Sequence, residues 1–196
     1  MFDPTVDPQL RSEILTRVGS QTMTDRERAR LFGLPDGCRI REGAKILAPQ
    51  KLKMGRDCWI GEHAVLDAQG GLEIGDSCQI GLYTMIWTHS SHRQALAGET
   101  GTSRDKIEYK PTKIGSNVFI AGPSVVLAGV TIGDGALISP MSLVDRDIPA
   151  GGRFNAQWER RQLEKRVAEL EQRLGEDWAR RLSRPADGGE RSATAS

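Results

Sequence analysis

Residues 114–148 read IGSNVF-IAGPSV-VLAGVT-IGDGAL-ISPMSL-VDRDI, and an aliphatic residue opens every group of six. The openers are Ile114, Ile120, Val126, Ile132, Ile138 and Val144. Four positions after each opener stands a second residue that is often small: Val118, Ser124, Val130, Ala136, Ser142 and Ile148. A six-residue period fits neither an α-helix nor a simple strand. It indicates a short strand and a turn, repeated three times per coil of a triangular prism whose axis is aliphatic.

The same period runs through earlier parts of the chain. The openers there are Met54, Ile60, Leu66, Ile74, Ile80 and Ile86, with a weaker series at Ile40, Ile46 and Leu52. The step from Leu66 to Ile74 is longer, so residues 67–71 should bulge. Glycine often follows the opener, which we interpret as a need for turn geometry. The pattern therefore predicts an all-β solenoid whose coils stack about 4.8 Å apart through parallel strand hydrogen bonds.

Composition excludes several functions. The 196 residues carry 27 Lys and Arg against 26 Asp and Glu, and so near-neutral a chain is not expected to bind nucleic acid or anionic membranes generally. No apolar run approaches the ~20 residues of a membrane helix, and the start MFDPTVDP does not look like a signal peptide, so we expect no membrane insertion. The three cysteines form no CxxC pair, and we expect a reduced, cytoplasmic protein.

The flanks of the repeat have helical patterns. Residues 1–38 form a predicted helical segment in which Thr24-Asp25-Arg26-Glu27 fits a capping box. Residues 39–150 form the predicted solenoid, with an inserted loop at 87–113. Residues 151–182 are expected to be a helix with a short coiled-coil-like apolar stripe, which we expect to pack along a neighbouring subunit. The tail, 183–196, is expected to be disordered.

Segments such as IGDSCQIG (74–81) and LVDRDIP (143–149), together with 114–148, resemble the hexapeptide-repeat acyltransferases over roughly residues 40–150. The resemblance implies a left-handed parallel β-helix, here with N-terminal helices and a C-terminal helix. It also implies an acetyl-CoA donor, no metal, and a homotrimer whose three sites lie between subunits.

The inserted loop holds the residues best suited to catalysis. It begins Trp87-Thr88-His89-Ser90-Ser91-His92 and ends in Glu108-Tyr109-Lys110-Pro111. A neutral imidazole can accept the proton of a weakly nucleophilic hydroxyl during acyl transfer. The motif resembles the maltose and galactoside O-acetyltransferase branch and related glycan O-acetyltransferases, which implies that His89 is the general base.

Three further residues are candidates for contact with a sugar or glycan acceptor. His92 matches a less constant position and is an acceptor contact or a second candidate base. Glu108 orients an imidazole, contacts the acceptor or is simply exposed. Asp67 occupies a stretch where such enzymes place acceptor-binding residues, although it could equally cap a turn.

The resemblance also suggests residues for donor binding in a groove between subunits: Ala121, Gly122, Ser139, Pro140 and Arg146. Small residues would admit the pantetheine arm to the backbone, and Arg146 would meet a CoA phosphate. Two departures from the family pattern affect this groove. Pro140-Met141 replaces the usual Ala-Gly, and residues 151–156 (GGRFNA) replace the usual tail.

Three other functions are alternatives to O-acetylation. N-acetylation of an amino-sugar nucleotide would use the same kind of base, and the sequence does not separate the two reactions. A non-catalytic trimeric scaffold fits the altered groove but not the long histidine-bearing loop. A zinc-dependent γ-type carbonic anhydrase fits poorly, because the three histidines do not follow that zinc pattern.

Overall fold

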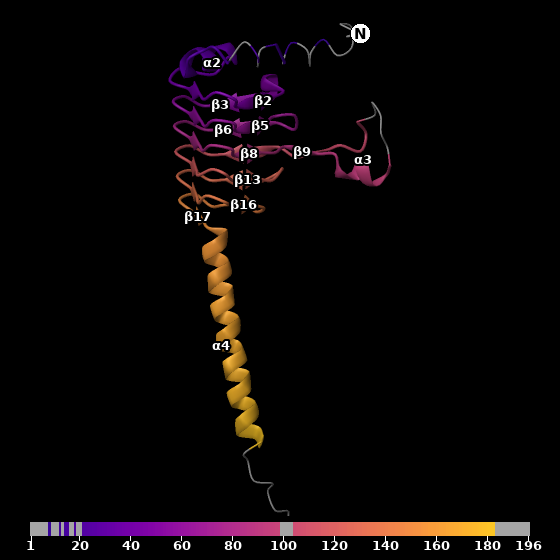
Figure 1. Ribbon diagram of the computed structural model, residues 1–196, viewed down its shortest axis with the longest axis vertical. Helices are drawn as coiled ribbons and strands as arrows, with labels where there is room; N and C mark the ends of the chain where they lie inside the picture. Colours follow the sequence, from indigo (N-terminus) through magenta and orange to yellow (C-terminus); the bar gives the residue numbers. More distant parts are fainter. Residues whose placement is uncertain are drawn as a thin grey trace, which may run out of the picture. The chain divides into compact units, whose positions relative to one another are not determined.

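A computed structural model describes residues 21–98 and 104–182, and before them only positions 8, 12, 14, 15 and 18. The chain divides into two compact units, residues 1–156 and 157–196. The first unit is a parallel β-solenoid with helices beside it, which confirms the predicted fold class (Figure 1). The expected disordered tail (183–196) and most of the first twenty residues of the expected helical segment (1–38) lie outside the described residues.

Three parallel sheets form the sides of the solenoid. Sheet I contains β1 (Arg39–Ile40), β4 (Trp59–Ile60), β7 (Gln79–Ile80), β12 (Phe119–Ile120), β15 (Leu137–Ile138) and β17 (Arg153–Phe154). Sheet II contains β2 (Lys45–Leu47), β5 (Val65–Asp67), β8 (Met85–Ile86), β13 (Val125–Val126) and β16 (Leu143–Val144). Sheet III contains β3 (Leu52–Met54), which follows the 3-10 turn η1 (Pro49–Lys51), then β6 (Leu72–Ile74), β11 (Thr112–Ile114) and β14 (Thr131–Ile132).

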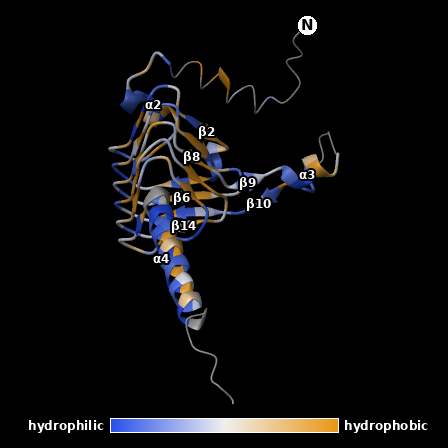
Figure 2. Cartoon of the chain, turned by 60° about the horizontal axis from the view of Figure 1, so that its bottom comes forward, coloured by the Kyte–Doolittle hydropathy of each residue, from blue (hydrophilic) through white to orange (hydrophobic). Residues whose placement is uncertain are grey.

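The six-residue openers form the axial core. In sheet I, Ile60 pairs with Ile40 on one side and with Ile80 on the other, so like residues stack from coil to coil. Most of the residues four positions after an opener are buried too, including Cys58, Ala64, Cys78 and Ser142, whereas Gly70 and Ser90 are half-buried. Figure 2 shows the apolar strands surrounded by hydrophilic turns. Burial of these aliphatic side chains is the main source of stability.

The glycines after the openers have a different role from the one expected. A Cβ on Gly61 would lie 2.6 Å from the backbone of Gly81 and Leu82 in the next coil, so close coil packing requires glycine there. The left-handed backbone lies two positions later, where non-glycine residues such as Asp57, His63 and Ser77 have φ between 56° and 59°. Tight stacking, rather than turn conformation, therefore explains the glycine pattern.

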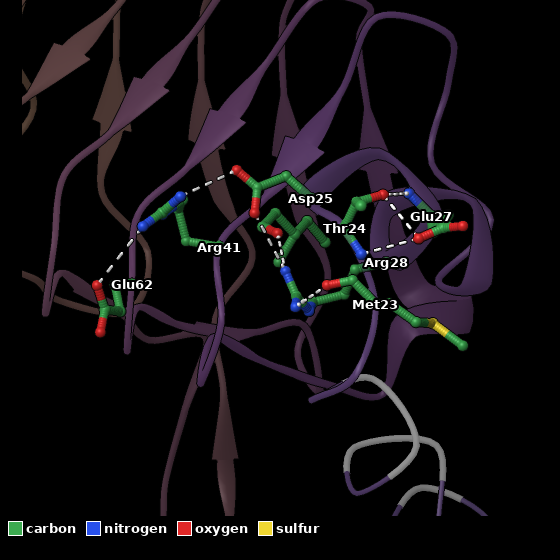
Figure 3. Close-up of polar contacts among 8 residues, drawn as sticks. Met23, Thr24, Asp25, Glu27, Arg28, Arg41 and Glu62 are labelled. Atoms are coloured by element: carbon green, nitrogen blue, oxygen red, sulfur yellow. Dashed lines mark hydrogen bonds and ion pairs between the residues drawn. The ribbon is translucent and has the colours of Figure 1, made fainter.

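Helix α2 (Asp25–Leu31) covers the first coil and confirms the expected capping box. Thr24 accepts from the backbone N–H of Glu27, whose carboxylate accepts from the N–H of Thr24 (Figure 3). The buried Arg28 donates to the carbonyls of Ile40 and Met23, both at 2.6 Å. Because these carbonyls accept from Arg28, the guanidinium ties the helix to the end of the solenoid.

Two segments lie outside the regular coils. Between β8 and β11 the chain forms an antiparallel hairpin of β9 (His89–Ser90) and β10 (Glu108–Tyr109), with the short helix α3 (His92–Leu96) between them. At the end of the solenoid, β17 pairs with β15, so the unusual GGRF segment continues sheet I beyond residue 150. Helix α4 (Ala156–Leu182) then forms the described part of the second unit.

Candidate active site

Asp67 ends strand β5 with its side chain fully buried. Its Oδ2 accepts from the backbone N–H of Thr88 at 2.8 Å and from the Thr88 hydroxyl at 3.1 Å. Its Oδ1 accepts from the N–H of Gln69 at 3.1 Å. This geometry does not fit the expected contact with the acceptor, because the carboxylate has no exposed surface and faces donors of its own chain.

His89 lies directly against this carboxylate. The imidazole Nδ1 is 2.6 Å from Asp67 Oδ2, and the histidine side chain is 19% exposed. The Thr88 hydroxyl accepts from the N–H of Gly70 at 2.8 Å, so its own proton is directed to Asp67. One side of the site is therefore a hydrogen-bond network around the buried Asp67, to which His89 contributes Nδ1. The other ring nitrogen, Nε2, lies on the side of the imidazole away from Asp67.

The β9–β10 hairpin fixes the position of the imidazole. His89 pairs with Tyr109 across the hairpin, and the two rings stack with centroids 6.1 Å apart. Thr112, at the start of β11, donates its hydroxyl to the carbonyl of Trp87 at 2.8 Å. Because both arms of the insertion bond to the coils, His89 has less freedom than a residue in an unsupported loop.

Beside His89 lies an open cavity of about 470 Å³. Its lining includes His89, His92 and Glu108, so the structure brings together three of the residues proposed from sequence. The sequence motif does not assign a contact with the acceptor to the other lining residues, which are Trp87, Ser90, Ser91, Lys110, Leu127 and Ala128. Leu127 and Ala128 follow β13, the neighbour of β8 in sheet II, and the repeat period could have placed them here.

The polar groups of the cavity are paired with one another. His92 Nδ1 lies 2.8 Å from the Ser90 hydroxyl. Glu108 lies 3.1 Å from Lys110 Nζ and 3.5 Å from an Arg93 nitrogen. The hydrogen bond from Lys110 holds the pKa of Glu108 below its usual value, so this carboxyl is ionised at neutral pH. Glu108 does not contact either imidazole ring through any hydrogen bond within the described part of the chain.

The proposed donor residues occupy two different corners of the solenoid. Ala121 and Gly122 follow β12, and Ser139 and Pro140 follow β15, so these four lie on the corner between sheets I and II. Arg146 follows β16 and lies on the corner between sheets II and III, where the inserted hairpin also leaves the coils. Its guanidinium lies 3.5 Å from Asp145 and 4.9 Å from the centre of the Phe154 ring. One chain therefore does not bring all five together.

No group of three or more His, Cys, Asp or Glu in the described part of the chain is arranged to hold a metal ion. None of the helices in residues 21–98 and 104–182 is both long and apolar enough to cross a membrane.

Six-residue repeats with a histidine-bearing insertion define a hexapeptide-repeat solenoid, and comparison with known proteins agrees. The family "Bacterial transferase hexapeptide (six repeats)" matches residues 111–146. The chain is 34% identical over 123 residues to the putative colanic acid biosynthesis acetyltransferase WcaF of Escherichia coli K12, covering 62% of this chain and 64% of WcaF. It is 30% identical to nodulation protein L of Rhizobium meliloti, covering 75% of this chain and 85% of that protein.

A solved structure is similar as well. The hexapeptide-repeat acetyltransferase VCA0836 of Vibrio cholerae O1 biovar eltor, in complex with acetyl-CoA, matches with a TM-score of 0.57 and 25% identity. The match covers 78% of this chain and 86% of that one. The chain belongs to the hexapeptide-repeat acyltransferase family.

Proposed function

We propose that the protein is an acetyl-CoA-dependent O-acetyltransferase that acts on a hydroxyl of a sugar or glycan, with His89 as general base. The observation that carries this proposal is the pairing of His89 with the buried Asp67 at 2.6 Å beside an open cavity. A carboxylate bonded to one imidazole nitrogen fixes the ring's tautomer and orientation. Membership of an acyltransferase family, and the acetyltransferase names of WcaF and VCA0836, support the reaction class.

The network around Asp67 supports a distinct role for each nitrogen of His89. Asp67 Oδ2 accepts from Thr88, so it is an acceptor toward Nδ1 as well, and Nδ1 carries the ring proton. Nε2 then has a free lone pair. In the reaction His89 Nε2 takes the proton of the acceptor hydroxyl while the hydroxyl oxygen forms a bond to the carbonyl carbon of the acetyl group. The C–S bond of the thioester breaks, and the imidazolium returns the proton to the departing thiolate.

The other candidate site residues take supporting roles in this proposal. Asp67 is a positioning residue that acts through His89, in place of the acceptor contact expected from sequence. His92 and Glu108 line the acceptor cavity, where Trp87, Leu127 and Ala128 supply an apolar wall. A pyranose has both apolar C–H faces and polar hydroxyls, so a cavity with both kinds of surface suits it.

Donor binding and the homotrimer are proposed together. Ala121, Gly122 and Ser139 are small and half-exposed, so the corner between sheets I and II leaves its backbone open to a narrow thioester arm. Large apolar side chains are exposed on that corner and on its flanking sheets: Leu82, Tyr83, Met85, Phe119, Met141 and Leu143. Sheet III instead presents Lys53, Glu73 and Lys113. An apolar region of this kind favours contact with another copy, which would place one copy's corner against its neighbour's His89 cavity.

The test compares His89→Ala with His63→Ala, which changes an exposed histidine at a turn away from the cavity. We expect His89→Ala to bind acetyl-CoA as the wild type does in calorimetry, but to lose roughly 10²–10⁴-fold in acetyl transfer to a sugar. His63→Ala should keep its turnover. Near-normal turnover in His89→Ala would reject the base, and absence of acetyl-CoA binding by the wild type would reject the transferase. Paired hydroxyl and amine acceptors distinguish O- from N-acetylation.

A further inference from the structure

Helix α4 carries an apolar stripe along one face. Leu163, Val167, Leu170, Leu174 and Trp178 are between 45% and 69% exposed. Their spacing places them along one face of the helix. Figure 2 shows orange segments between blue ones along α4. Five large apolar side chains on one exposed face indicate a surface built for a partner.

The first four of these residues follow a heptad pattern. Leu163 and Leu170 take the d positions, and Val167 and Leu174 take the a positions, which form the seam of a coiled coil. The stripe thus predicts packing against another helix with the same period. The charged residues that flank the seam then determine which helix is the partner and in which direction it runs.

The two flanks have opposite charge. On the e side lie Glu164 and Glu171, followed by Trp178, and on the g side lie Arg166, Arg173 and Arg180. Pairs between e and g residues set the partner and the orientation of coiled coils. If two copies of α4 run parallel, the basic flank of one faces the acidic flank of the other. An antiparallel pair would instead place arginine against arginine and glutamate against glutamate.

Individual contacts follow from the parallel register. Arg166 of one helix would lie beside Glu171 of the next, and Arg173 would lie over Trp178, which suits a cation–π contact. Arg166, Glu171 and Arg173 form no ion pair with residues of the described chain. The same register puts Glu159 opposite Glu164, but Glu164 already pairs with Arg160 of its own helix at 3.0 Å.

From these observations we infer that α4 self-associates as a parallel coiled coil with the α4 helices of other copies of this chain. The helix carries seven basic and six acidic residues, so its charge does not favour an anionic membrane as the occupant. Two heptads alone form a weak coiled coil. The inference therefore rests on the proposed homotrimer, which supplies the high local concentration that makes the association effective.

The test is cysteine cross-linking of the full-length chain. Leu163→Cys and Leu174→Cys place a thiol at each end of the seam, and both should cross-link to their own counterpart with a short bismaleimide. Only a parallel, in-register arrangement brings both positions near their counterparts in another copy. In an antiparallel pair a residue can lie beside its own counterpart at only one level along the helix. Lys165→Cys and Gln172→Cys on the opposite face are matched controls and should cross-link little.

A charge exchange tests the flanks of the seam independently. In the Leu163→Cys variant, R166E should reduce the yield of cross-linking at position 163. Adding E171R to R166E should restore that yield. Equal cross-linking of seam and control positions, or no rescue by the second substitution, would overturn the inference. Sedimentation of the wild type separates the two proposals: a monomer rejects the trimer, whereas a trimer without seam cross-links rejects only the coiled coil.

Discussion

The carboxylate of Asp67 lies 2.6 Å from Nδ1 of His89, although the two residues are 22 positions apart in the chain. Strand β5 pairs with β8 so that Leu66 lies beside Ile86. The residues that follow these two openers are therefore neighbours on adjacent coils. Asp67 and His89, which are about one coil apart along the chain, are thus in direct contact in the candidate site.

Asp67→Asn tests whether this contact positions the base. An amide presents a donor to groups that need an acceptor, so it disfavours the tautomer that leaves Nε2 free. We expect kcat to fall on the order of 10²-fold, a smaller loss than that of His89→Ala, with KM for acetyl-CoA unchanged. The measurement is steady-state kinetics with circular dichroism as the folding control. Unchanged kcat in a folded variant would assign Asp67 a purely structural role.

Thr84 and Thr112 are fully buried threonines with opposite hydrogen bonding. Within the described part of the chain the Thr84 hydroxyl has no hydrogen-bond partner, whereas Thr112 donates to Trp87 and accepts from the N–H of Gly129. Thr84→Val should raise the free energy of unfolding by about 1 kcal/mol, because it removes an unsatisfied polar group. Thr112→Val should lower it by about 1–3 kcal/mol. Urea titration measures both, and equal effects would contradict the hydrogen-bond assignment.

Gly61 and Gly175 test the role of the glycines. Alanine at position 61 would bring its Cβ within 2.6 Å of backbone atoms in the next coil, so Gly61→Ala should destabilise the solenoid by roughly 1–3 kcal/mol. At Gly175 in α4 a Cβ would meet nothing within 4 Å. Gly175→Ala should stabilise the helix by about 1 kcal/mol, through helix propensity. Thermal melts followed by circular dichroism compare the two, and a stable Gly61→Ala would reject the close-packing explanation.

The buried thiols predict a loss of stability in alkali. Burial raises the pKa of Cys38, and the interaction with Cys78 together with burial raises that of Cys58, whereas the same interaction lowers the pKa of Cys78, which therefore does not contribute to a loss of stability above pH 9. Above the ordinary thiol pKa of 9.0 the unfolded chain loses protons that the native state keeps. The free energy of unfolding should therefore fall as pH rises above 9. Urea titrations across this range should show a smaller fall in Cys38→Ala/Cys58→Ala, and an identical fall would exclude these thiols as its source.

Much of the candidate site could be placed from sequence because the six-residue period assigns each residue to a position in a coil of the solenoid. The period located the break at residue 87, and the TH-x-x-H motif identified His89 as a candidate base. The role of Asp67 could not be obtained in this way. Its burial depends on the hairpin and on donors from Thr88, which are long-range contacts that no local pattern encodes.

By itself the sequence determined the solenoid, its core positions and the heptad stripe of α4, since each depends on a short period repeated along the chain. Only the tertiary structure decided that Asp67 faces His89, that glycine is needed for close coils, and that the proposed donor residues lie on two corners. The physical reason is the same in each case. Periodicity fixes which side of the backbone a residue occupies, whereas contacts between coils depend on register and packing in three dimensions.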